Sequence, residues 1–128
     1  MIQRKRIYEP SAPSDGQRLL VDRLWPRGVS KLNARLDDWL KVIAPSTALR
    51  QAYHQGSLTF AELTERYEAE LLGQPEAVAC LTDLAARSAT QALTFIYAAR
   101  DTEQNHVCIL MGLLQRQFGA LCSGEALA

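Results

Sequence analysis

Two pairs of opposite charges, Asp22-Arg23 and Arg100-Asp101, each come at the end of an apolar run of the chain. An arginine guanidinium donates two parallel hydrogen bonds to a carboxylate or a phosphate, which suits it to hold an anion. A carboxylate beside each guanidinium balances and orients that charge while the site is empty. Further polar residues lie within a few positions of each pair. We therefore expect an anion-binding pocket built from seven residues: Asp22, Arg23, Arg27, Arg100, Asp101, Asn105 and His106.

The same residues also suit purely structural roles. Asp101 has the character of a helix N-cap, with Gln104 three positions later, and Asp–Arg pairs often tie neighbouring loops together. The sequence therefore favours an arginine-lined pocket for an anionic small molecule, and it leaves open whether a reaction is catalysed there.

The two histidines, His54 and His106, are candidates for a general base, because imidazole exchanges protons near neutral pH. His54 also suits the C-terminal end of a short helix, where an imidazole complements the helix dipole. His106 and Cys108 are two positions apart and point to different faces of a helix, so we predict no metal site. Neither a G-x-G-x-x-G nor a P-loop motif is present, and we predict no cofactor. The three cysteines form no C-x-x-C pair, and we predict that thiol chemistry plays no part.

Two apolar runs, at residues 18–25 and 92–99, predict the strands that position the charged pairs. The second run is apolar on both faces, as in parallel sheets that are covered on both sides. The segment Lys5–Tyr8 predicts an edge strand. If the two main strands are parallel, their carboxyl ends meet at the sheet edge where open α/β sheets bind ligands.

The helices are predicted from apolar periodicity and capping residues. Trp39 is expected to pack its helix on the sheet beside Leu36 and Ile43. Five helices are expected: one through Leu36, Leu40 and Ile43 that Pro45 ends, one capped by Ser46, one opened by a capping box of Thr59 and Glu62, one begun by Pro75, and one opened by Asp101.

These elements predict a single α/β domain over residues 1–118, followed by a frayed tail at 119–128. The expected architecture is a small, mainly parallel sheet of three or four strands, covered by about five helices.

Charge is balanced over the 128 residues, with 14 basic and 14 acidic side chains. Residues 1–50 hold ten basic and five acidic side chains (+5), whereas residues 51–128 hold four and nine (−5). The alternative function is therefore a regulatory or interaction module that binds protein or nucleic acid through a flat basic patch of the first half. The zero net charge makes nucleic acid the less favoured partner. The patch would contain Arg4, Lys5, Arg6, Lys31 and Arg35.

No apolar stretch approaches the length of about 18 residues that spans a bilayer. The basic first residues lack the apolar segment of a signal peptide. We therefore expect a cytoplasmic protein without a membrane partner.

The segment 20–31, LVDRLWPRGVSK, resembles the signature of the YeaO-like family, which is grouped under domain of unknown function 488. The resemblance extends over residues 4–118 and implies a small bacterial cytosolic α/β protein without an assigned biochemical role. Relatives in the wider family carry two cysteines, whose positions fall by motif order on Tyr97 and Asn105. The resemblance thus implies that this chain has lost any thiol chemistry of those relatives. Its further matches are Trp39-Leu40-Lys41, Ala44-Pro45-Ser46, Leu49-Arg50, Arg66-Tyr67 with Glu70-Leu71, and Tyr97 to Asp101 with Asn105-His106.

Overall fold

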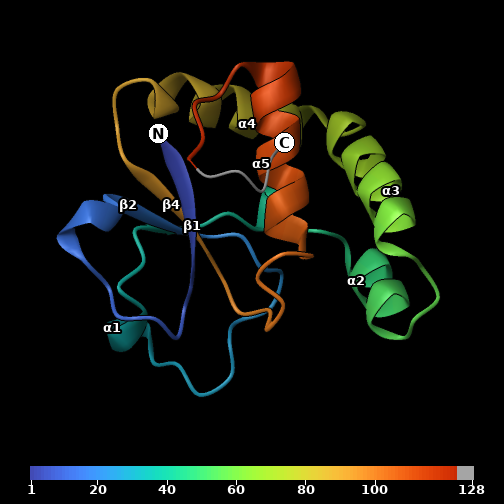
Figure 1. Cartoon of the computed structure of the whole chain (residues 1–128), viewed down its shortest axis with the longest axis horizontal. Helices are drawn as coiled ribbons and strands as arrows, with labels where there is room; N and C mark the ends of the chain where they lie inside the picture. Colours follow the sequence, from blue (N-terminus) through green and yellow to red (C-terminus); the bar gives the residue numbers. More distant parts are fainter. Residues whose placement is uncertain (124–128) are drawn as a thin grey trace.

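The computed structural model describes residues 1–123 as one α/β domain built on a four-stranded parallel sheet (Figure 1). The strands are β1 (Ile2–Arg6), β2 (Gln17–Leu20), β3 (Asp38–Trp39) and β4 (Leu93–Tyr97), in the spatial order β1-β4-β2-β3. The fold class predicted from the sequence is confirmed.

The two main predicted strands, β2 and β4, are neighbours at the centre of the sheet and run parallel. Leu19 lies opposite Phe95 and Leu20 opposite Ile96, and all four side chains are buried. The edge strand β1 pairs with β4 and begins at Ile2, earlier than the segment that the sequence indicated.

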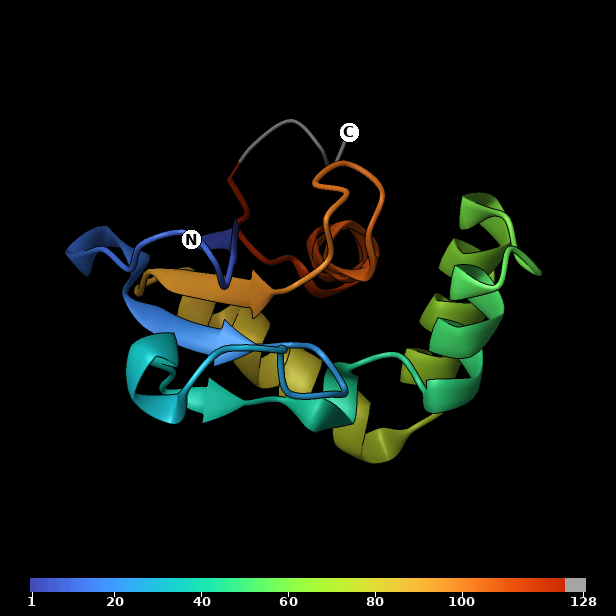
Figure 2. The same cartoon turned by 90° about the horizontal axis from the view of Figure 1, so that it is seen from below.

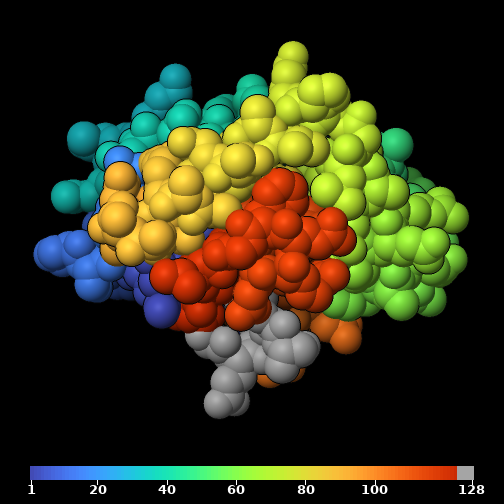
Figure 3. Space-filling model, turned by 90° about the horizontal axis from the view of Figure 1, so that it is seen from above, coloured from blue at the N-terminus to red at the C-terminus, as the bar shows by residue number. Residues whose placement is uncertain are grey.

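Helices α4 (Pro75–Ser88) and α5 (His106–Phe118) cover one face of the sheet, and α3 (Phe60–Leu72) packs against both of them. Figure 3 shows them lying side by side in the space-filling view. Their apolar stripes form one core with alternate sheet residues, among them Leu19 and Phe95. The predicted capping box of Thr59 and Glu62 opens α3, and Pro75 occupies the first turn of α4.

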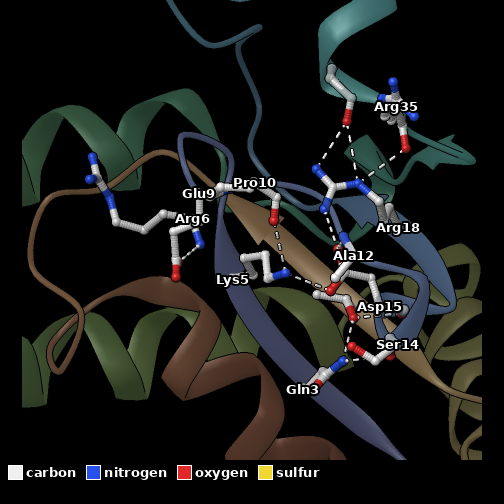
Figure 4. Close-up of polar contacts among 12 residues, drawn as sticks. Gln3, Lys5, Arg6, Glu9, Pro10, Ala12, Ser14, Asp15, Arg18 and Arg35 are labelled. Atoms are coloured by element: carbon white, nitrogen blue, oxygen red, sulfur yellow. Dashed lines mark hydrogen bonds and ion pairs between the residues drawn. The ribbon is translucent and has the colours of Figure 1, made fainter.

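Loops and the single-turn helix α1 (Lys31–Ala34) cover the other face. The apolar cluster on this face is small and centres on Leu20 and Ile96. Beside that cluster, Asp15 accepts hydrogen bonds from Lys5 and Arg18, each at 2.6 Å (Figure 4). We call these three residues the ion triad.

Gly16 lets the loop before β2 cross the start of β4. Its φ is +61°, and a Cβ atom there would lie 2.2 Å from the carbonyl oxygen of Ala92. Gln17 donates its backbone N–H to that same oxygen at 3.0 Å, so the close approach belongs to the sheet itself. Only glycine combines this conformation with this distance.

The expected helix through Leu36 and Ile43 is not formed. This segment instead contains β3, which pairs with β2, and a 3₁₀ turn at Lys41–Ile43. Trp39 lies on the strand and packs edge-on against Trp25, with ring centroids 5.4 Å apart. Pairing with a neighbouring strand outweighed a helical spacing that only three apolar residues supported.

The segment expected to fray from residue 119 onward remains part of the fold up to Ser123. Gly119 ends α5 in the left-handed conformation, and Cys122 forms a parallel bridge with Ile2. Backbone hydrogen bonds join Ile2 to Leu121 and to Ser123. The rest of that predicted tail, 124–128, lies outside the described residues.

The helix α2 (Thr47–His54) stands with α3 beyond the carboxyl ends of the strands (Figure 2). As predicted, Ser46 caps it by accepting the backbone N–H of Leu49. No helix in residues 1–123 is long and apolar enough to cross a membrane.

Candidate functional site

All seven residues predicted for the site line one open pocket of about 630 Å³. The pocket is lined by the loops that follow β2 and β4 and by helix α2. Figure 2 shows α2 beyond the carboxyl ends of the strands. Because β2 and β4 are parallel neighbours, their carboxyl ends bring segments about 75 residues apart in the sequence to one edge.

Asp22, directly after β2, ties the two strand ends together. Its Oδ2 atom accepts the backbone N–H of Ala98 at 3.0 Å. Its Oδ1 atom lies 3.0 Å from Nε2 of His106, yet it accepts no hydrogen bond, because that N–H is directed to the carbonyl of Val21 at 3.1 Å. Both neighbours of Nε2 are acceptors, so this nitrogen carries the proton and is already committed within the fold.

Arg23 is committed to the backbone rather than to Asp22. Its guanidinium donates to the carbonyl of Pro45 at 2.9 Å and to that of Ala44 at 3.2 Å. These carbonyls belong to the turn that leads into α2. Arg23 therefore fixes the far wall of the pocket against the sheet.

Helix α5 begins later than predicted, at His106 rather than at Asp101. Asp101 accepts the backbone N–H groups of Glu103 and Gln104, both at 2.9 Å, and so forms a turn of its own. These bonds, that from Gln104 first, lower the pKa of Asp101. A short acceptor that satisfies nearby N–H groups stabilises a turn as readily as a helix start.

Asn105 is the actual cap of α5 and is buried. Its Oδ1 atom accepts the N–H of Cys108 at 3.1 Å, and its Nδ2 donates to the carbonyl of Asp101 at 2.8 Å. Both ends of the side chain amide are thus used, so Asn105 holds the wall of the pocket. Neither Asp22 nor Asp101 is paired with an arginine in the described part of the chain, contrary to the expected charge-balancing arrangement.

Three arginines face the pocket without such commitments. Within residues 1–123, the side chains of Arg27, Arg50 and Arg100 make no hydrogen bond and no ion pair. The Nε atom of Arg50 is buried without a partner. Arg27 and Arg100 were predicted for the site, whereas Arg50, which comes from α2 together with Tyr53 and His54, was not. The Leu49-Arg50 match was the available signal, but it did not place Arg50 at the strand ends, because that depends on where α2 docks.

Helix α2 is anchored where it meets α3. The backbone N–H of Ser46 donates to Oε1 of Glu70 at 2.8 Å. Nearby, the hydroxyl of Tyr67 donates to the carbonyl of Ile43. Burial raises the pKa of Tyr67 well above its ordinary value, and the charges of Glu70 and Asp22 act in the same direction. These contacts fix the position of α2 relative to α3, and with it the position of Arg50 in the wall of the pocket.

The thiols lie outside the pocket lining. Burial raises the pKa of Cys80, and it raises that of Cys122 to about 11, which keeps both thiols protonated near neutral pH. Cys108 is buried at the start of α5. Within residues 1–123, no three side chains of His, Cys, Asp or Glu gather in a way that could hold a metal ion.

Comparison with known proteins identifies the family of this chain. A family model described as "Inactive DUF488-N3 subclade" matches residues 1–125. The chain belongs to the DUF488 family. It is 46% identical over 114 residues to "Uncharacterized protein YeaO" of Escherichia coli (strain K12), which covers 89% of this chain and 96% of the relative. It is 41% identical over 109 residues to "Uncharacterized protein Rv3073c" of Mycobacterium tuberculosis (strain ATCC 25618 / H37Rv), covering 85% of this chain and 89% of the relative. No solved structure matches it significantly.

The two positions at which the resemblance to the wider DUF488 family places cysteines hold residues with other tasks here. Tyr97 is the last residue of β4 and is buried. Asn105 caps the next helix. A side chain that is held in the core and one that uses both ends of its amide have little freedom to attack a substrate.

Proposed function

We propose that this DUF488 protein binds an anionic small molecule in the pocket at the carboxyl edge of its sheet. The observation that carries the proposal is the set of uncommitted arginines, Arg27, Arg50 and Arg100, which line one pocket. The buried Nε atom of Arg50 has no partner in residues 1–123, and a buried donor without an acceptor costs stability unless a ligand supplies one.

The charge of the pocket lining supports the same ligand class. Four arginines and two aspartates line it, a formal charge of +2 when the histidines are not counted. Oδ2 of Asp22 and Oδ1 of Asp101 accept backbone N–H groups, and neither carboxylate forms an ion pair with an arginine in residues 1–123. An anion of comparable charge would complete the pocket.

We further propose that the protein binds this ligand without turning it over. The family model that matches the chain is described as inactive. The Nε2 proton of His106 is directed to a backbone carbonyl, which leaves that nitrogen unable to act as a base. The cytoplasmic location expected from the sequence is part of the same proposal.

The interaction-module alternative is less well supported, because three members of its expected basic patch are engaged within the fold. Lys5 is paired with Asp15, Arg6 donates to the carbonyls of Ala98 and Ala99, and Arg4 donates to that of Thr102. A patch of exposed basic side chains would have to be built without them.

The test is the thermal shift and calorimetric titration of the purified protein with inorganic phosphate and with citrate at low salt. Arg50→Gln should weaken binding of whichever anion binds by about tenfold, the value of one charge-assisted hydrogen bond. Arg66→Gln is the matched control, because Arg66 is exposed on α3 and lies outside the pocket. Absence of binding by both anions, or an equal loss in both variants, would refute the proposal. Salt-sensitive binding of an oligonucleotide alone would favour the interaction module.

A further inference from the structure

The walls of the pocket are mainly apolar, which an inorganic anion would leave uncovered. Aromatic side chains come from both sides of the pocket: Tyr8 and Trp25 from loops that follow strands, and Tyr53 and His54 from α2. Ligand pockets typically combine such apolar walls with a few convergent polar groups. The apolar walls therefore indicate that the ligand has an apolar body in addition to its anionic group.

Other contacts hold these rings in place, so a ligand would find them already ordered. The indole N–H of Trp25 donates to the carbonyl of Val29 at 2.7 Å. The hydroxyl of Tyr8 donates to the carbonyl of Arg27 at 3.2 Å. Tyr53 packs against Phe60 with ring centroids 6.2 Å apart. Fixed aromatic rings favour a flat partner, since stacking then costs little side-chain entropy.

The charge of the pocket distinguishes among anions. The pocket lining carries a formal charge of +2, whereas a carboxylate supplies one negative charge. A phosphate monoester carries about −1.5 to −2 near pH 7 and has three acceptor oxygens, enough for several guanidinium groups. The pocket volume of about 630 Å³ leaves room for a ring beside the phosphate.

We infer that the ligand is a phosphate monoester attached to a planar ring, held by the free arginines and by the aromatic walls of the same pocket. This inference rests on the proposed function and specifies its ligand class.

The test compares four probes by calorimetry on the full chain at one pH and salt concentration: inorganic phosphate, phenyl phosphate, cyclohexyl phosphate and phenyl sulfate. Phenyl phosphate should bind about tenfold more tightly than inorganic phosphate, as expected for one stacked ring. Cyclohexyl phosphate should fall between them. Phenyl sulfate, with a single charge, should bind at least several-fold more weakly than phenyl phosphate.

Two variants locate the effect. Tyr53→Leu should reduce the advantage of phenyl over cyclohexyl phosphate, while Tyr53→Phe should retain the advantage. Phe118→Leu, at the end of α5 and outside the pocket, is the control for a general effect of losing an aromatic ring.

The outcomes separate the two proposals. Binding of inorganic phosphate without any gain from the ring would overturn the inference and leave the proposed function standing. Equal affinity for phenyl sulfate and phenyl phosphate would overturn the phosphate assignment. Failure of every anion, citrate included, would overturn the proposed function itself.

Discussion

The two faces of the sheet are covered by different means. On one face, α4 and α5, with α3 packed against them, supply a continuous apolar core around Leu19 and Phe95. On the other, loops and a single-turn helix leave a small apolar cluster beside the ion triad of Lys5, Asp15 and Arg18. The same strands serve both faces, so the difference comes from what covers them.

The two coverings differ in how many backbone carbonyls they leave without a hydrogen-bond donor. A helix pairs its own backbone groups, whereas a loop needs donors from elsewhere. Arg18 supplies donors to the carbonyls of Ala34 and Arg35, and Lys5 supplies one to that of Pro10. Much of the basic character of the first 50 residues is therefore explained by the need to hold loops.

The helix-covered face should be the most sensitive to a loss of volume. Phe95 is fully buried in β4, so Phe95→Ala leaves a cavity and should lower the free energy of unfolding by about 3–5 kcal/mol. Urea denaturation followed by circular dichroism measures this. A loss below 1 kcal/mol would mean that the core on this face is not close-packed.

The loop-covered face should depend on charge to nearly the same extent. Asp15→Asn leaves Lys5 and Arg18 without their shared anion, in a site where the Asp15 side chain is 2% exposed. The expected loss is about 3 kcal/mol in the same denaturation experiment. Lys5→Met is the control, with an expected loss of about 1 kcal/mol, because Arg18 still pairs with Asp15 and Lys5 is the more exposed of the two cations. If the two variants lose equal stability, the triad does not act as described.

Trp39 belongs to the loop-covered face, and its replacement should have an intermediate effect. The ring is half-buried, and its indole N–H donates to the carbonyl of Asp22 at 2.6 Å. Trp39→Ala should cost about 2 kcal/mol, less than a fully buried tryptophan. Trp39→Phe keeps the contact with Trp25 and should recover about half of that loss. No recovery would assign the whole effect to the hydrogen bond.

Acidification should affect the loop-covered face through Asp15. The expected change in the free energy of unfolding is smaller than for the substitutions above. Burial by itself raises the pKa of Asp15, but hydrogen bonds from Lys5, Ala12 and Arg18 outweigh it and lower the pKa below the ordinary 3.8. Stability from a lowered pKa is fully present above the unfolded-state value near 4 and is lost as the pH falls through the folded value. Wild type should therefore lose more stability than Asp15→Asn below about pH 4. Phe95→Ala should follow the wild-type pH dependence, and a curve matching that of Asp15→Asn would contradict this.

The smallest effect on stability is expected for Arg100→Gln. Its guanidinium makes no contact that holds the fold together in residues 1–123, so the change should stay within about 0.5 kcal/mol. Arg23→Gln removes donors from the carbonyls of Ala44 and Pro45 and should cost about 1–2 kcal/mol. Anion titration of the Arg100 variant then measures binding alone, and unchanged affinity would remove Arg100 from the site.

Sequence patterns were sufficient where one local signal had no competitor. The apolar runs before Asp22 and Arg100 determined the central strands, and the capping box at Thr59 determined the start of α3. The parallel pairing then placed both charged pairs at one pocket, because parallel strands end on the same edge.

The failures came from residues whose chemistry suits two structures. Asp101 stabilises a turn with the same oxygen that would have capped a helix, and Asn105 takes the cap instead. Trp39 has the spacing of a helical residue but pairs with Leu20 across strands. Arg50 was missed because its membership in the pocket depends on where α2 docks, which the sequence pattern of α2 alone does not specify.

The short bridge between Ile2 and Cys122 limits strand pairing between one copy of the chain and another. An edge strand with free N–H and C=O groups is a template on which another chain can add a strand. Here the backbone of Leu121 and Ser123 already occupies the outer groups of Ile2, and the Arg4 side chain reaches over to the carbonyl of Thr102. The segment after α5 thus blocks intermolecular β-pairing at the amino end of β1.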